Sequence, residues 1–134
     1  MTHEKSWQPY FLKLCSHGYR TALATGSGFP DTLLIDGEKH FFVELKNLEI
    51  GASGDRYIHT VYKPSQPPWH MEYLYKGGKS LYTLFKLNQG YGVVKECKDY
   101  VRALASKKLK YSDLPNFQYR EYRVLKDLIK HEFS

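Results

Sequence analysis

The clearest pattern of hydrophobic and polar positions lies between residues 32 and 46. Residues 32–35 are apolar or β-branched, residues 36–39 have the composition of a turn, and residues 41–46 form a second apolar run. Within this second run every other side chain is apolar, so Glu44 and Lys46 share the opposite face. The pattern predicts a β-hairpin that carries polar groups on one face near its open end.

Asp31 precedes the first strand of this hairpin, and its position relative to Glu44 depends on the turn. A four-residue turn at 36–39 would pair Ile35 with His40 and place Asp31 directly opposite Glu44. A two-residue turn would leave Glu44 on the diagonal. Both registers keep the two acids and the lysine on one face, because only a slip by an odd number of residues exchanges the faces.

The rest of the chain alternates between helical and extended patterns. In order, we predict a helix that starts at Ser6 and stops at Gly18, a strand over 19–24, the hairpin, a strand over 56–63, a helix from Pro67 to Gly77, strands over 80–87 and 91–94, and helices over 98–108 and 118–133. This order predicts an α/β fold in which helices lie on both faces of a mixed sheet. The core would span about residues 6–95, and 98–134 would add extra C-terminal helices.

Length and composition are typical of one globular domain over residues 1–134. Apolar residues make up 42% of the 134 residues and aromatic residues 16%, which argues against a disordered chain. The sequence contains no run of membrane-spanning length and no secretory signal at its start, so we expect an intracellular protein. Cys15 and Cys97 have no metal-binding spacing, and we expect both to be reduced and buried.

The net charge of +6 favours a polyanionic partner such as a nucleic acid. The densest basic tract contains Lys107, Lys108 and Lys110. These lysines are candidates for gripping a nucleic-acid backbone; the alternative is a solvated helix end whose charge complements the helix dipole.

Two acids and a lysine on one face are the minimal set for metal-dependent hydrolysis of a phosphodiester. Carboxylates such as Asp31 and Glu44 suit Mg²⁺, and the backbone carbonyl of Leu45 is a further candidate ligand. The Lys46 ammonium would position or activate the attacking water and stabilise charge on the phosphate. The alternative is an ordinary antiparallel strand whose Glu and Lys face solvent.

The surroundings of the motif resemble the core of the PD-(D/E)XK nuclease superfamily. The similarity rests on the Gly/Ser-rich run 24–31 that ends in Pro-Asp, on 41–46 with its Glu-Leu-Lys, and on Gln66 at the entrance of the following helix. Within the superfamily the motif order is most similar to the virus-type replication-repair (VRR-NUC) nucleases and the archaeal-type Holliday junction resolvases. The resemblance covers about residues 8–87.

The resemblance implies a restriction-endonuclease-like core of order αβββαβ, a requirement for Mg²⁺ that Mn²⁺ can replace, and an active-site position for Gln66. A capping role is the alternative for Gln66. Many members carry a further metal-binding acid on the first helix, and Glu4 or Asp55 are the candidates here.

Further contacts to a nucleic acid are predicted beside this site. Ser27 in the glycine-rich loop is suited to a phosphate oxygen or a metal-bound water, with a plain turn serine as the alternative. Arg56, His59 and Lys63 lie on the predicted strand that follows the hairpin and are candidates for backbone phosphates.

Three function classes remain open from the sequence. The resemblance favours a metal-dependent DNA endonuclease that acts on branched or otherwise structured DNA, with a role in repair or recombination and a phage, viral or cellular origin. The others are an RNA endonuclease on the same fold and a catalytically silent nucleic-acid-binding module. A junction-resolving enzyme would be a homodimer, because a four-way junction offers two symmetric strands.

Overall fold

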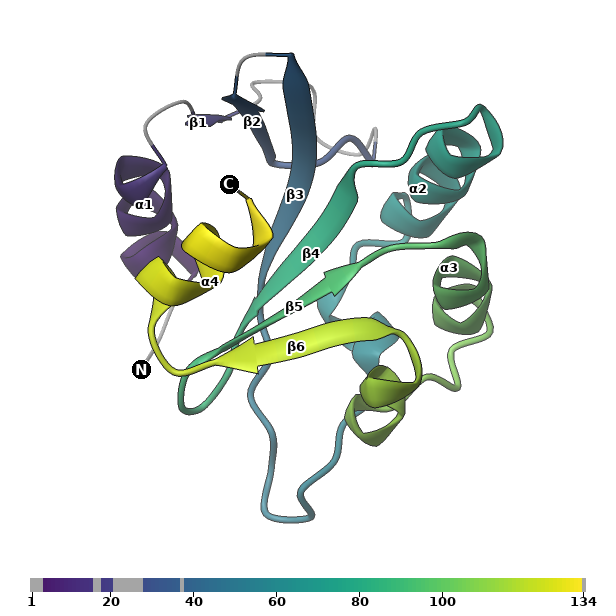
Figure 1. Ribbon diagram of the computed structural model, residues 1–134. Coiled ribbons are helices and arrows are strands. Elements are labelled where there is room, and N and C mark those ends of the chain that lie inside the picture. The colour runs from purple at the N-terminus through teal and green to yellow at the C-terminus, as the bar shows by residue number, and fades with distance from the viewer. Residues whose placement is uncertain (1–3, 16–17, 21–27, 37, 134) are drawn as a thin grey trace.

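The computed structural model describes residues 4–15, 18–20, 28–36 and 38–133 of the chain (Figure 1). Its helices are α1 (Glu4–Leu14), α2 (Gln66–Tyr75), α3 (Lys98–Ala105) and α4 (Leu125–Glu132), with short 3₁₀ helices η1 (Ile58–Val61) and η2 (Tyr111–Asn116). Its strands are β1 (Gly18–Arg20), β2 (Thr32–Asp36), β3 (Lys39–Asn47), β4 (Leu81–Lys86), β5 (Tyr91–Lys95) and β6 (Gln118–Tyr122).

The strands form one six-stranded sheet in the order β1-β2-β3-β4-β5-β6. The pair β3–β4 is parallel and every other neighbouring pair is antiparallel. A parallel pair needs a crossover connection, and this connection contains η1 and α2. The predicted α/β class with a mixed sheet flanked by helices is therefore confirmed.

Helices cover both faces of the sheet (Figure 1). α1 and α4 contact each other on one face, and α2 and α3 contact each other on the other. Each layer closes its own apolar cluster: Val43 and Leu45 pack toward α1 and α4, whereas Leu81 and Phe85 pack toward α2 and α3. The central strands β3 and β4 are thus buried on both sides, which fixes their register firmly.

The predicted strand over residues 56–63 is wrong. The chain there forms η1, and its only pairing within the described residues is an isolated bridge between Tyr57 and Lys110. Ile58 and Tyr62 are both buried, and a spacing of four suits a helical turn as well as an alternating strand. Arg56 Nε also donates to Thr60 Oγ1 at 3.2 Å, a contact between residues four apart that the turn brings together.

The predicted helix over residues 118–133 is half wrong, because its first part is the edge strand β6. Pairing with β5 supplies backbone partners to residues 118–122. The Tyr119 side chain of β6 packs closely over Gly92 of β5, where a Cβ would lie 2.2 Å from the Tyr119 hydroxyl. The C-terminal third therefore completes the sheet as well as adding helices.

Three smaller predictions also need correction. α1 begins at Glu4, ahead of the predicted cap at Ser6, and α3 ends at Ala105, not at residue 108. Both cysteines are free thiols, but Cys15 is only half-buried and Cys97 is exposed. Among the described residues, none of the helices has the length and apolar character that crossing a bilayer requires.

Candidate active site

The hairpin brings Asp31 directly opposite Glu44. Ile35 pairs with His40 and Thr32 pairs with Val43, so the four-residue turn is the register that forms. The backbone amide of Asp31 donates a hydrogen bond of 2.9 Å to Glu44 Oε1. The predicted proximity of the two acids is thereby confirmed, and the Glu44 side chain is held by the backbone that carries its partner.

Lys46 follows on the same face of β3 and is only 4% exposed. Its ammonium nitrogen lies 5.8 Å from the centroid of the Tyr62 ring, whose face attracts a cation. Leu45, between the two, packs into the opposite apolar cluster, and its carbonyl oxygen lies 3.5 Å from Nε2 of Gln8 on α1. The carbonyl predicted as a metal ligand therefore already faces an amide donor.

Gln66 is the first residue of α2 and is buried. Its Oε1 accepts a hydrogen bond of 2.8 Å from the backbone amide of Lys63. Gly28 packs against the turn that precedes α2: its φ is +81°, and a Cβ there would lie 2.1 Å from the carbonyl oxygen of Ser65. Gly28 is thus in close contact with the residue that precedes α2.

The electrostatics around Asp31 favour a cation. Burial raises the pKa of the Asp31 carboxyl, and the nearby charge of Glu44 raises it further. The charges of Lys46 and Lys63 and a hydrogen bond from the Leu45 backbone act in the opposite direction but do not cancel the rise in pKa. A divalent cation between the two carboxyl groups would offset the repulsion between their charges.

His70 is a part of this region that the sequence analysis missed. It lies on α2 four residues after Gln66, so both side chains project from the same helix face, and it is fully buried. Nδ1 of His70 lies 2.7 Å from Glu96 Oε1, and Nε2 lies 3.6 Å from Glu44 Oε2, a charge contact longer than a hydrogen bond. The spacing from Gln66 is the one signal in the sequence that could have found it.

The two acids determine the charge of His70. Burial by itself lowers the pKa of the imidazole, but Glu96 and Glu44 outweigh burial and raise the pKa to about 9. The same Glu96 accepts a hydrogen bond from Thr83, which pairs with Glu44 across β3 and β4. A line of polar groups therefore runs from Asp31 through Glu44 and His70 to Glu96 after β5, with a charge contact in place of a hydrogen bond between Glu44 and His70.

The other predicted contacts are spread more widely. Lys63 is exposed and close enough to Asp31 to affect its pKa. Arg56 is bound to Thr60 and to the carbonyl of Glu49, and His59 packs on Tyr57. Lys107, Lys108 and Lys110 are exposed near the end of α3, and the Lys110 ammonium lies over the Tyr57 ring.

Asp55, one of the two candidates for the additional acid, is bound elsewhere in the described structure. Its carboxylate accepts hydrogen bonds from the backbone amide and the hydroxyl of Ser112. The side chain of Glu4 and the whole of Ser27 lie outside the residues that can be described. Among the described residues, no group of three or more His, Cys, Asp or Glu side chains is arranged to hold a metal ion.

Comparisons with models of protein families and with curated proteins find no match to this chain.

Proposed function

We propose that this protein is a metal-dependent DNA endonuclease that hydrolyses phosphodiester bonds at Asp31, Glu44 and Lys46. The observation that carries the proposal is the hydrogen bond from the Asp31 amide to Glu44 Oε1 across the open end of the hairpin. It joins the two acids on the face that also carries Lys46. The order of α1, three strands, α2 and β4 agrees with the αβββαβ core of the PD-(D/E)XK nucleases.

The donor set fits Mg²⁺ or Mn²⁺. Asp31 and Glu44 supply oxygen ligands, and the Oε2 atom of Glu44 is buried with no hydrogen-bond partner among the described residues. Burial, and after it the charge of Glu44, raises the pKa of the Asp31 carboxyl, so a bound cation would favour its charged form. When bound, the metal would lower the pKa of a coordinated water and draw charge from the scissile phosphate.

The chain's own residues would orient the reacting groups. The Lys46 ammonium, confined beside Tyr62, would hold the attacking water and offset charge on the phosphate. Gln66 keeps the turn before α2 closed through its bond to the Lys63 amide. The exposed Lys63 ammonium is thereby kept near Asp31, where it would hold a backbone phosphate of the substrate.

A catalytically silent nucleic-acid-binding module is the second candidate. Glu44 is 0% exposed and has His70 beside its second oxygen, which is the environment of a structural carboxylate as much as that of a metal ligand. In that case the two acids and His70 stabilise the fold, and the positive surface alone contacts nucleic acid. Metal binding separates the two candidates.

The test is a cleavage assay on labelled four-way junction, flap, duplex and single-stranded DNA and on RNA, with Mg²⁺, with Mn²⁺ and with EDTA. We expect metal-dependent cleavage of a branched DNA, lost in Asp31→Asn and Glu44→Gln with nucleic-acid affinity held within a few-fold. Lys46→Ala should lower turnover by about 10²-fold. Glu38→Gln, which changes an exposed acid of the same hairpin, is the matched control and should cleave normally.

Isothermal titration with Mg²⁺ completes the test. Binding of Mg²⁺ that Glu44→Gln abolishes supports the nuclease, whereas nucleic-acid binding without any metal binding or cleavage favours the silent module. Preferential cleavage of RNA would move the substrate to RNA on the same site. Sedimentation of the protein alone and with a junction would test the expected dimer.

A further inference from the structure

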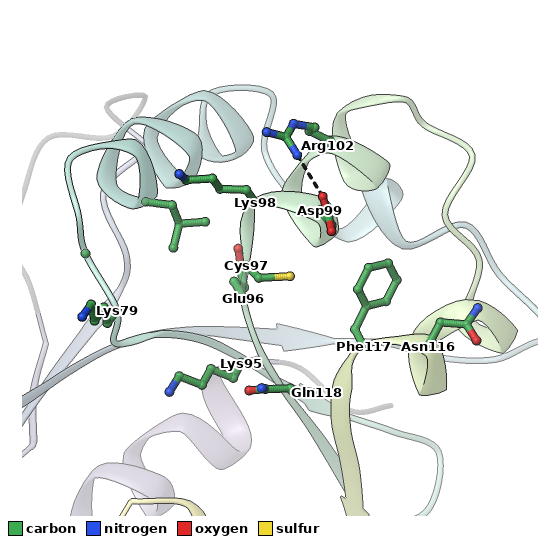
Figure 2. A pocket seen from close by; sticks show the side chains of 12 residues that line it. Lys79, Lys95, Glu96, Cys97, Lys98, Asp99, Arg102, Asn116, Phe117 and Gln118 are labelled. Carbon is green, nitrogen blue, oxygen red and sulfur yellow. Dashed lines mark hydrogen bonds and ion pairs between the residues drawn. The ribbon is translucent and has the colours of Figure 1, made fainter.

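A hollow of about 930 Å³ opens where the end of β5 meets the start of α3. Its walls come from the loop after α2, from the segment that joins β5 to α3, and from the junction of η2 and β6 (Figure 2). Neither Asp31 nor Glu44 is among the described residues that line it. Its size falls in the range of about 300–1,000 Å³ that is typical of ligand sites.

The charge of the hollow is strongly positive on one side. Figure 2 shows Lys79, Lys95 and Lys98 around the same side, and all three side chains are exposed. One lining acid, Glu96, is buried and turned inward to His70, so it does not neutralise the lysines. Three exposed lysines on one side of the hollow favour an anion with more than one charge, such as a phosphate.

Arg102 adds a fixed guanidinium at the rim. Its Nη1 donates to Asp99 Oδ1 at 2.8 Å and its Nη2 donates to the Tyr75 hydroxyl at 3.1 Å. The same Tyr75 ring lies 4.7 Å from the Lys98 ammonium. Asp99, the second acid that lines the hollow, is therefore paired with Arg102. Arg102 and Lys98 both lie beside the Tyr75 ring, which is 60% exposed.

The opposite side of the hollow is aromatic and amide-lined. Figure 2 shows the Phe117 ring facing the lysines across the space, with Asn116 beside it and Gln118 below. Phe117 is held edge-on by the buried Tyr100, with ring centroids 5.4 Å apart. A fixed ring flanked by amide groups is suited to stack on a nucleobase and to bond its edge.

We propose that this hollow binds a phosphorylated nucleotide unit, with the phosphate at Lys79, Lys95 and Lys98 and the base against Phe117. The unit is either a free nucleotide or one residue of a nucleic-acid strand, since both present the same phosphate and base. The proposal goes beyond the endonuclease function and does not depend on it, because the hollow shares none of the three residues that would carry cleavage.

The test is a titration of ¹⁵N-labelled protein with adenosine 5′-monophosphate, adenosine, inorganic phosphate and a short single-stranded DNA, all in EDTA so that no cleavage occurs. We expect amide shifts at residues 95–99 and 116–118 with the monophosphate, and much weaker binding of adenosine. Tighter binding of the DNA than of the monophosphate would identify a strand as the source, and the reverse order would identify a free nucleotide.

Substitutions on each side of the hollow test which part of the nucleotide that side binds. Lys79→Gln, Lys95→Gln and Lys98→Gln combined should weaken monophosphate binding by about tenfold or more. The matched control removes three exposed lysines of α1 and α4, Lys13, Lys126 and Lys130, and should bind normally. Phe117→Leu should weaken the monophosphate but leave inorganic phosphate unchanged. The proposal is overturned if none of the probes shifts these amides, or if the control loses affinity as much as the test variant does.

Discussion

Nδ1 of His70 lies 2.7 Å from Oε1 of Glu96, and both side chains are shut off from solvent. The other ring nitrogen faces Glu44, so one imidazole stands between two buried acids that come from β3 and from the end of β5. A buried charge is tolerated only when it is paired. His70 therefore ties α2 to the sheet and sets the surroundings of the candidate metal ligand.

His70→Ala should lower the free energy of unfolding by about 3–5 kcal/mol, because it leaves buried carboxylates without their partner. The measurement is urea unfolding followed by circular dichroism, in EDTA. His40→Ala is the control, since His40 is an exposed histidine of β3. Equal, small losses in the two variants would show that the His70 contacts contribute little.

The pairing of His70 should also make stability depend on pH. Because its pKa in the folded protein is raised from 6.5 to about 9, the contribution of the ion pairs is fully present below about pH 6.5 and is lost as the pH rises through 9. The whole effect is on the order of 3 kcal/mol. Unfolding of the metal-free protein between pH 6 and 10 measures it, and His70→Gln should remove this slope. A difference between the two proteins that does not change with pH would contradict the assignment.

Asp31→Asn should raise the melting temperature of the metal-free protein at neutral pH while it abolishes cleavage. The raised pKa means that the ionised carboxyl is less favourable in the folded state, so Asp31 adds to stability only when protonated, at pH values below the raised pKa. Asparagine keeps the size and an acceptor oxygen without the charge. Thermal unfolding with and without Mg²⁺ tests this, with Asp127→Asn on the exposed side of α4 as the control. If Asp31→Asn melts at a lower temperature than the wild-type protein in EDTA, the ionised Asp31 carboxylate does not destabilise the folded state.

Among the predicted phosphate contacts, the structure singles out Lys63. Lys63→Ala should lower kcat/KM by about tenfold through the loss of local positive charge. Arg56→Ala should change it little, because this side chain is already bound to Thr60 and Glu49. Steady-state cleavage at several salt concentrations compares the two variants.

Replacing Lys107, Lys108 and Lys110 together should flatten the salt dependence of DNA binding by about 0.9 log unit per lost duplex phosphate contact and leave turnover intact.

Gly28→Ala should destabilise the protein by about 1–3 kcal/mol and reduce cleavage, because the residue needs a positive φ and has no room for a Cβ against Ser65. Gly51→Ala is a suitable control, since no atom lies within 4 Å of its added Cβ. Chemical unfolding and cleavage rates are measured on both variants. Normal stability in Gly28→Ala would mean that the loop can retreat from α2.

The hairpin was predictable because its signal is local. Alternation in β3 fixes the face of Glu44 and Lys46, and both turns that the sequence allows keep Asp31 on that face. The pairing of Ile35 with His40 in the structure decides between the two turns. The order of the central elements follows from similar periodic runs. The errors at residues 56–63 and 118–122 arise because the apolar positions of a short stretch fit both the helical and the strand period, so that contacts with the rest of the fold decide between helix and strand.

His70 and Glu96 could not be predicted in the same way. They lie 26 positions apart and meet only because α2 crosses over the sheet and β5 ends beneath it. Each one alone is an ordinary polar residue in the sequence. The hollow beside α3 depends likewise on the edge strand β6, whose position is set by the Tyr119 contact with Gly92.

Helix α2 reaches both regions of interest. His70 meets the buried acids Glu44 and Glu96, while Leu74 near the other end of the helix lines the hollow. A helix of this length behaves as a rod about 15 Å long, so a tilt that a nucleotide imposes at one end moves the imidazole beside Glu44. By thermodynamic linkage, any factor by which such a nucleotide changes the affinity for Mg²⁺ must equal the factor by which Mg²⁺ changes the affinity for the nucleotide.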